Sequence, residues 1–152
     1  GMSYADWLTI TTPAAGAAAS YIVPGQFAAR ILAARLSLTT DGTAANRFVS
    51  LDYIDARGIT RMRNAAGLVV TASTTGQVFE WSAQRTISEW AANTPVLVPV
   101  APWWLPPGFT VKFAVDTIQT TDQISALSLW IETMRGTWKE IPVGLSTVFP
   151  VD

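Results

Sequence analysis

The chain of 152 residues contains neither cysteine nor histidine. Without cysteine there is no disulfide, no thiol nucleophile and no zinc–thiolate site. Without histidine, Ser-His catalytic groups, histidine general bases and histidine metal ligands are all excluded. These absences remove a large share of enzyme mechanisms, and we expect a protein without catalytic activity.

Charged residues are scarce. They make up 14% of the chain and hydrophobic residues 49%, whereas an ordinary soluble domain has roughly 25% charged residues. Because few charges are available to cover the surface, we expect self-association or docking into a larger assembly, with a homotrimer as the first expectation. The net charge of −1 gives no strong field toward nucleic acid or anionic membrane, so neither is an expected partner.

The chain also lacks a long apolar run and an internal linker. No run reaches the ~18 residues that a membrane span needs, and the apolar stretch 95–107 is interrupted by five prolines. The length is that of one domain. We predict a sandwich domain at 21–136, preceded by an N-terminal arm at 1–20. A tail at 137–152 is expected to pack on its own or on a neighbouring subunit.

The segment Trp103–Val115, read WWLPPGFTVKFAV, has the clearest pattern in the chain. Apolar residues alternate with polar ones after the Pro-Pro-Gly turn, and this period of two predicts a half-buried β-strand. Since proline cannot donate a ladder hydrogen bond, the turn should close before the strand begins. The residues expected on the buried face are Phe109, Val111, Phe113 and Val115.

Short strand-like segments separated by turn residues recur along the chain. The segment 26–40 fits either a helix or a strand with two apolar faces, and we favour the strand. Residues 64–67 are predicted to be a turn between two strands, and 87–92 is the only other candidate helical turn. Together these features predict an all-β fold, a single-domain antiparallel β-sandwich resembling a jelly roll. The other expected strands are 4–12, 48–54, 59–63, 68–72, 78–82, 96–100 and 124–134.

The carboxylates do not form an obvious catalytic or metal-binding group. Asp52 and Asp55 lie three apart on or beside a strand, so they should face opposite sides. Asp116 and Asp122 flank a loop and could join a calcium site, but the EF-hand spacing is absent and turn-forming aspartates are the favoured reading. Nothing local pairs the glutamates that glycosidase chemistry would need, namely Glu80, Glu89, Glu132 and Glu140. We expect no catalytic, cofactor-binding or metal-binding residues, and no cofactor.

Arginine outnumbers lysine by eight to two. Arg57, Arg61 and Arg63 cluster, and the last two share a face if their segment is a strand. Interfaces are enriched in arginine and depleted in lysine, so we favour the interpretation that this cluster belongs to a subunit interface. A plain solvated surface and a phosphate-binding or DNA-binding surface are the alternatives.

Seven tryptophans are many for this length. Trp81 and Trp130 lie within alternating segments and are predicted to be core or inter-sheet anchors. Trp103 and Trp104 are adjacent, so in an extended chain they face opposite ways and one should be exposed. Such a residue could anchor a protein interface or stack on a sugar ring. Composition does not separate these alternatives.

An ordered set of short motifs runs from Tyr21 to Glu132. This set resembles small structural proteins of tailed bacteriophages, which typically read VPG, a long strand, ANR, LP-x-G-aromatic and D-Q-x-S. Phe109 stands where these proteins commonly have tryptophan, and the segments before Tyr21 and after Gly136 fall outside the resemblance. The motifs are Tyr21-Ile22-Val23-Pro24-Gly25, the segment ending at Leu38-Thr39-Thr40, Ala44-Ala45-Asn46-Arg47, Trp104-Leu105-Pro106-Pro107-Gly108-Phe109, and Asp122-Gln123-Ile124-Ser125.

The resemblance implies a virion component of sandwich fold, assembled in the host cytoplasm. It would act in head decoration, the neck or the tail by packing against itself and other virion proteins, and it favours a strand at 26–40. The alternative function is a carbohydrate-binding module, or a receptor-binding tail domain, that recognises a host glycan through Trp103 or Trp104.

Overall fold

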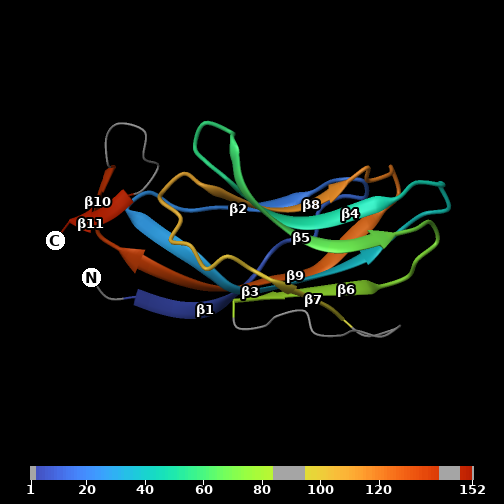
Figure 1. Ribbon diagram of the computed structural model, residues 1–152, viewed down its shortest axis with the longest axis horizontal. Coiled ribbons are helices and arrows are strands. Elements are labelled where there is room, and N and C mark those ends of the chain that lie inside the picture. Colours follow the sequence, from blue (N-terminus) through green and yellow to red (C-terminus); the bar gives the residue numbers. More distant parts are fainter. Residues whose placement is uncertain (1–2, 84–94, 141–147, 152) are drawn as a thin grey trace.

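The computed structural model describes residues 3–83, 95–140 and 148–151, and within these ranges the fold is all-β (Figure 1). The helical turn predicted at 87–92 lies outside the described residues. No helix in the described part of the chain is long and apolar enough to cross a membrane. The strands are β1 (Ser3–Thr9), β2 (Ala19–Ile22), β3 (Phe27–Thr39), β4 (Arg47–Ile54), β5 (Thr60–Val70), β6 (Gln77–Ser82), β7 (Val96–Pro99), β8 (Thr110–Asp116), β9 (Gln123–Arg135), β10 (Thr137–Glu140) and β11 (Val148–Val151).

Two sheets pack face to face and form a β-sandwich (Figure 1). One has the strand order β1-β9-β3-β6-β7 and the other β2-β8-β4-β5, so the chain crosses between the sheets at most connections. Without β7, these orders are those of a jelly roll, and they confirm the predicted fold class. β7 pairs with β6 in parallel and is the exception among the otherwise antiparallel pairs. β10 and β11 form a separate two-stranded sheet.

Residues 3–9, which we placed in an N-terminal arm, form the edge strand β1 of the five-stranded sheet. They pair with Ser128–Met134 of β9 without a break in register. The predicted strand at 4–12 is therefore present, and it is an integral part of the sandwich. How the residues after 136 pack stays a prediction.

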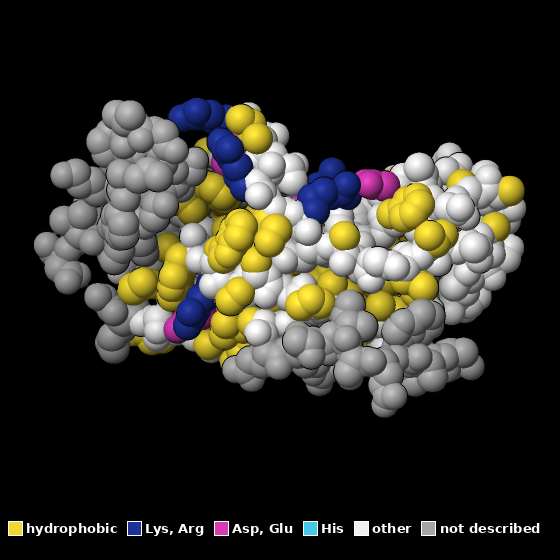
Figure 2. Space-filling view, viewed as in Figure 1, with side chains coloured by type: hydrophobic (Ala, Val, Ile, Leu, Met, Phe, Trp, Pro, Cys, Tyr) yellow, Lys and Arg dark blue, Asp and Glu magenta, His cyan; other side chains and the backbone are white. Residues whose placement is uncertain are grey.

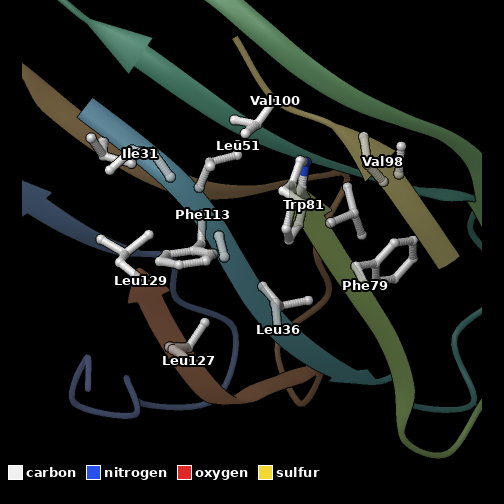
Figure 3. Packing of buried hydrophobic residues seen from close by; sticks show 14 of the residues in the cluster. Ile31, Leu36, Leu51, Phe79, Trp81, Val98, Val100, Phe113, Leu127 and Leu129 are labelled. Atoms are coloured by element: carbon white, nitrogen blue, oxygen red, sulfur yellow. The ribbon is translucent and has the colours of Figure 1, made fainter. Parts of the chain in front are cut away.

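Large apolar side chains from both sheets meet between them and form the core (Figure 3). Trp81 of β6 is 1% exposed and packs edge-on against Phe113 of β8, with ring centroids 6.3 Å apart. Its indole nitrogen donates to the Asn64 carbonyl at 2.9 Å, so the polar end of the ring is satisfied in the interior. The prediction that Trp81 anchors the core is confirmed.

The alternation predicted for Phe109–Val115 is confirmed within β8, whereas Phe109 precedes the strand and is only partly buried against the core. Val111, Phe113 and Val115 are buried, and the strand begins at Thr110, directly after the Pro-Pro-Gly turn. The ambiguous segment 26–40 is a strand, β3, and every second residue over most of its length enters the core. Its register shifts between Ile31 and Ala33, which keeps both Ile31 and Ala34 buried.

Two positions differ from the predicted pattern because of β-bulges. Residues 64–67, predicted to be a turn, continue β5, and the ladder to β4 shifts register there. Gly67 has φ +70°, a backbone conformation that glycine adopts without strain and that often marks a bulge within a strand. In β9, Ala126 has φ +52°, and this bulge places Ile124 and Leu127 together in the core instead of on opposite faces.

Candidate functional site

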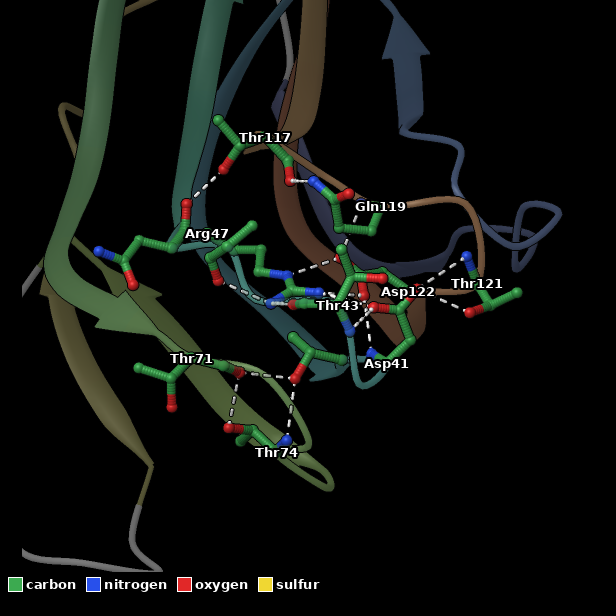
Figure 4. A network of polar contacts seen from close by, with 12 residues as sticks. Asp41, Thr43, Arg47, Thr71, Thr74, Thr117, Gln119, Thr121 and Asp122 are labelled. Carbon is green, nitrogen blue, oxygen red and sulfur yellow. Dashed lines mark hydrogen bonds and ion pairs between the residues drawn. The ribbon is translucent and has the colours of Figure 1, made fainter.

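A buried ionic network joins two loops at one end of the sandwich (Figure 4). The Arg47 side chain is fully buried, and its Nε donates to Asp122 Oδ2 at 2.9 Å while Nη2 donates to Asp122 Oδ1 at 3.0 Å. Nη2 also donates to Asp41 at 2.9 Å, and Nη1 donates to the carbonyls of Thr43 and Ala45. These hydrogen bonds satisfy the donors of the Arg47 guanidinium and hold the β3–β4 loop against the β8–β9 loop.

The two aspartates of this network stay ionised in the fold. Burial by itself would raise the pKa of Asp122, but hydrogen bonds from Arg47 and from the amides of Asp41 and Gln119 lower it overall. A hydrogen bond from the Thr121 hydroxyl and one from the Thr43 amide lower the pKa of Asp41 to about 2. The network is therefore a structural connection between loops.

The aspartates considered for a calcium site do not come together. Asp122 is saturated by Arg47 and backbone amides, as expected for a turn-forming aspartate. Asp116 instead accepts from Arg63 on the outer face of the four-stranded sheet. The described residues contain no group of acidic side chains that could hold a metal ion.

The predicted arginine cluster lies on the four-stranded sheet and its β4–β5 turn, and Figure 2 shows basic side chains along the upper edge of the molecule in this view. Arg63 bonds to Asp116 at 3.0 Å and to Asp52 at 3.2 Å. Arg61 bonds to Asp55 at 2.8 Å, and Arg57 is exposed in the β4–β5 turn. Asp52 and Asp55 thus each have an arginine partner.

These ion pairs limit the ability of the arginine cluster to bind an anionic ligand. Arg61 and Arg63 already have carboxylate partners, so binding a phosphate would require breaking pairs that the fold supplies. Two glutamates weighed for catalysis are paired in the same way on the other sheet, Glu80 with Arg35 at 2.6 Å and Glu132 with Arg30 at 2.5 Å. Glu89 lies outside the described residues.

The adjacent tryptophans point to different sides, as predicted. Trp103 is 48% exposed, and its ring lies 6.3 Å from that of the buried Tyr53. Trp104 is half-buried, with the Arg30 guanidinium 4.8 Å from its ring centre. Because Ala29 and Ile31 enter the core, Arg30 and Trp104 lie on the outer face of the five-stranded sheet.

A contact between two tryptophans on this outer face was not predicted. Trp130 was expected in or between the sheets, but it alternates with the buried Leu129 and Ile131 and therefore faces outward. It packs directly across from Trp7 of β1, with ring centroids 5.2 Å apart, and Trp7 is 57% exposed. The alternation on either side of Trp130 was visible in the sequence, but its cross-strand partner was not.

The outer face of the five-stranded sheet therefore carries three tryptophans, Trp7, Trp104 and Trp130. Beside Trp7 lies a shallow hollow of about 330 Å³ that is also bordered by Arg35 and Glu80. Comparison of the chain with protein-family models, curated proteins and solved structures yielded no match. The arrangement places three aromatic side chains on one outer face of the sandwich.

Proposed function

We propose that this chain is a non-enzymatic structural protein that acts by packing against copies of itself and against other proteins. The observation that carries the proposal is the Trp7–Trp130 pair, which leaves a tryptophan more than half exposed on the outer face of a sheet. Tryptophan is a favoured anchor of protein interfaces. Such a residue on a sparsely charged chain supports a contact role.

The ionic groups support the same proposal. Arg30, Arg35, Arg47, Arg61 and Arg63 all bond to carboxylates within the chain. These pairs fix loops and sheet faces and leave aromatic surface as the principal means of recognition.

Within this role, a component of a bacteriophage virion is the more specific proposal. It rests on the ordered motifs between Tyr21 and Glu132, and the network links two of them. Arg47 ends Ala44-Ala45-Asn46-Arg47 and Asp122 begins Asp122-Gln123-Ile124-Ser125, so their spacing is tied to one buried contact. Jelly rolls occur in both viral capsid and lectin domains, so the fold itself does not choose between them.

The experiment is to measure molar mass in solution by size-exclusion chromatography with light scattering. A discrete oligomer that weakens in Trp7→Ser supports packing through this face, whereas a strict monomer at high concentration argues against self-association. For the virion proposal, density-purified phage particles from the source strain would be examined by mass spectrometry. Absence of the chain from these particles would remove that assignment alone.

Glycan binding is the second candidate function, and the exposure of Trp103 favours it. Its ring is supported from one side by Tyr53 and is 48% exposed, which leaves surface on which a sugar could stack. A glycan array compares the wild-type chain with Trp103→Ala. Binding that depends on Trp103 supports a lectin-like role, and an array at background removes it.

A further inference from the structure

The outer edge of β1 presents backbone N–H and C=O groups that are not paired with another strand in the described part of the chain. β1 ends the order of the five-stranded sheet, and nothing in the described part of the chain pairs with its other side. The Ile10 amide donates toward β9, to the Leu127 carbonyl at 3.0 Å. In an antiparallel ladder the backbone N–H and C=O groups of successive residues point alternately to the two neighbouring strands. Since those of Ile10 point to β9, those of Ala5, Trp7 and Thr9 point to the open edge. Consistent with this, the Trp7 amide bonds to the Asp6 side chain at 2.8 Å.

Little protects this edge from pairing with another strand. Edge strands are commonly blunted by proline, lysine, an inward-pointing charge, bulges or very short length, and of these β1 has the charge alone, because Asp6 shares the face of Leu8, which packs against the core. β1 reads SYADWLT, contains one charge, Asp6, and pairs with β9 over seven residues without a register shift. The Asp6 carboxylate can be displaced from the Trp7 amide by a carbonyl of an incoming strand.

We propose that β1 pairs antiparallel with β1 of a second copy about a twofold axis, and that the two five-stranded sheets become one continuous sheet. This inference rests on the proposed self-association and names its geometry. A twofold antiparallel edge contact uses the same patch on both subunits and closes with two copies. It therefore predicts a dimer in place of the trimer expected from composition.

The side chains of β1 select the register of this contact. A continuous sheet with matching faces requires residues of the same parity to lie opposite each other. A register centred on Asp6 places two carboxylates directly opposite, which is destabilising. A register centred on Ala5 places two small side chains at the axis and leaves Thr9 without a partner in the described part of the second copy.

The register centred on Trp7 has neither disadvantage. Trp7 lies opposite Trp7 of the second copy, and Ala5 lies opposite Thr9, so the residues with outward backbone groups pair with each other. Each Trp7 already packs on its own Trp130 at 5.2 Å. The dimer would thus contain a ladder of four indoles across its centre, and cross-strand aromatic pairs add stability to such a contact.

The first test is a proline variant on the open edge. Ala5→Pro removes an amide that points away from β9, so the pairing of β1 with β9 keeps its hydrogen bonds. We expect light scattering to show twice the chain mass for the wild type and for the control Ala5→Ser, and a single chain mass for Ala5→Pro. A thermal melt verifies that Ala5→Pro is folded.

The second test reads the register directly and uses the absence of native cysteine. Chains carrying Ala5→Cys are mixed with chains carrying Thr9→Cys and oxidised. Hydrogen-bonded antiparallel pairs have Cα atoms about 5.5 Å apart, within the range of a disulfide. We expect a disulfide-linked dimer from the mixture and none from either variant alone, because residue 5 meets residue 9 only when Trp7 lies on the axis.

The outcomes separate this inference from the proposed function. A dimer that survives Ala5→Pro, a trimer, or a disulfide from Ala5→Cys alone overturns the proposed contact while leaving self-association in place. A monomeric wild type overturns both the contact and self-association. Dissociation by Ala5→Pro together with the mixed disulfide supports the contact.

Discussion

At the scale of single residues, Arg47 and Asp122 are the charges that the fold depends on most. Both side chains are fully buried, and each supplies the other with a bidentate partner. Replacing one member of a buried ion pair leaves an uncompensated charge in the interior. The pair therefore holds the loops together only while both members are present.

We expect Asp122→Asn to lower the free energy of unfolding by about 3–5 kcal/mol, the usual cost of breaking a buried ion pair. Urea denaturation followed by tryptophan fluorescence measures the change. Asp116→Asn is the matched control, because Asp116 and Arg63 are both substantially exposed and such pairs contribute about 0–1 kcal/mol. Equal losses in the two variants would contradict the assigned role of the network.

The same network predicts how stability depends on pH. Asp41 has a pKa of about 2 in the folded chain against an ordinary value of 3.8, and the pKa of Asp122 is also lowered. A carboxyl group whose pKa is lower in the folded chain than in the unfolded chain stabilises the fold at pH values above its unfolded pKa. This stabilisation is lost as the pH falls toward the folded pKa. We therefore expect thermal stability to decline from about pH 4 toward pH 2.

The control for this pH dependence is Asp41→Asn. Its melting temperature should be lower than that of the wild type at neutral pH and should decline less between pH 4 and pH 2. A wild-type melting temperature that stays flat across this range would contradict the prediction.

At the scale of elements, the sequence predicted strands where alternation is unbroken and misplaced them where a bulge intervenes. Phe109–Val115 keeps its period, so its position and buried face were both predicted. In β9 the bulge at Ala126 interrupts the alternation, so Ile124 and Leu127 share the buried face although they lie three residues apart. Alanine carries no local signal for a positive φ, so this bulge depends on the register that β3 imposes.

The bulge leads to a prediction about Ala126. A β-branched side chain is strained at φ +52°, so Ala126→Val should destabilise the chain by about 1–3 kcal/mol. Ala126→Gly, which tolerates this φ, should stay within about 1 kcal/mol of the wild type. Chemical denaturation of both variants tests this. A stable Ala126→Val would show that β9 can shift its register at little cost.

At the scale of the whole molecule, the core and the outer aromatic face are separate groups of side chains. The fold class and the core position of Trp81 were predictable from local patterns. The Trp7–Trp130 contact and the Arg47–Asp122 ion pair were not predictable, because each joins residues that are far apart in the sequence. Long-range pairs of this kind arise from topology, which a single sequence specifies only indirectly.

This separation predicts different behaviour for two tryptophans. Trp81→Ala should cost about 3–5 kcal/mol, because it leaves a large cavity in the core. Trp130→Ala should cost less stability, because Trp130 is half-buried, and should weaken self-association by removing the support for Trp7. Denaturation and light scattering on both variants test this. A loss of stability as large for Trp130→Ala as for Trp81→Ala would contradict it.

The pairing of β1 with β9 also affects how the chain is made. Residues 3–9 pair with residues 128–134, so β1 is synthesised long before the strand with which it pairs. Non-local pairing of this kind slows folding and leaves unpaired strands exposed in the meantime. During translation both sides of β1 are open until β9 leaves the ribosome. A nascent chain therefore passes through a period in which premature contacts between neighbouring chains compete with completion of the sheet.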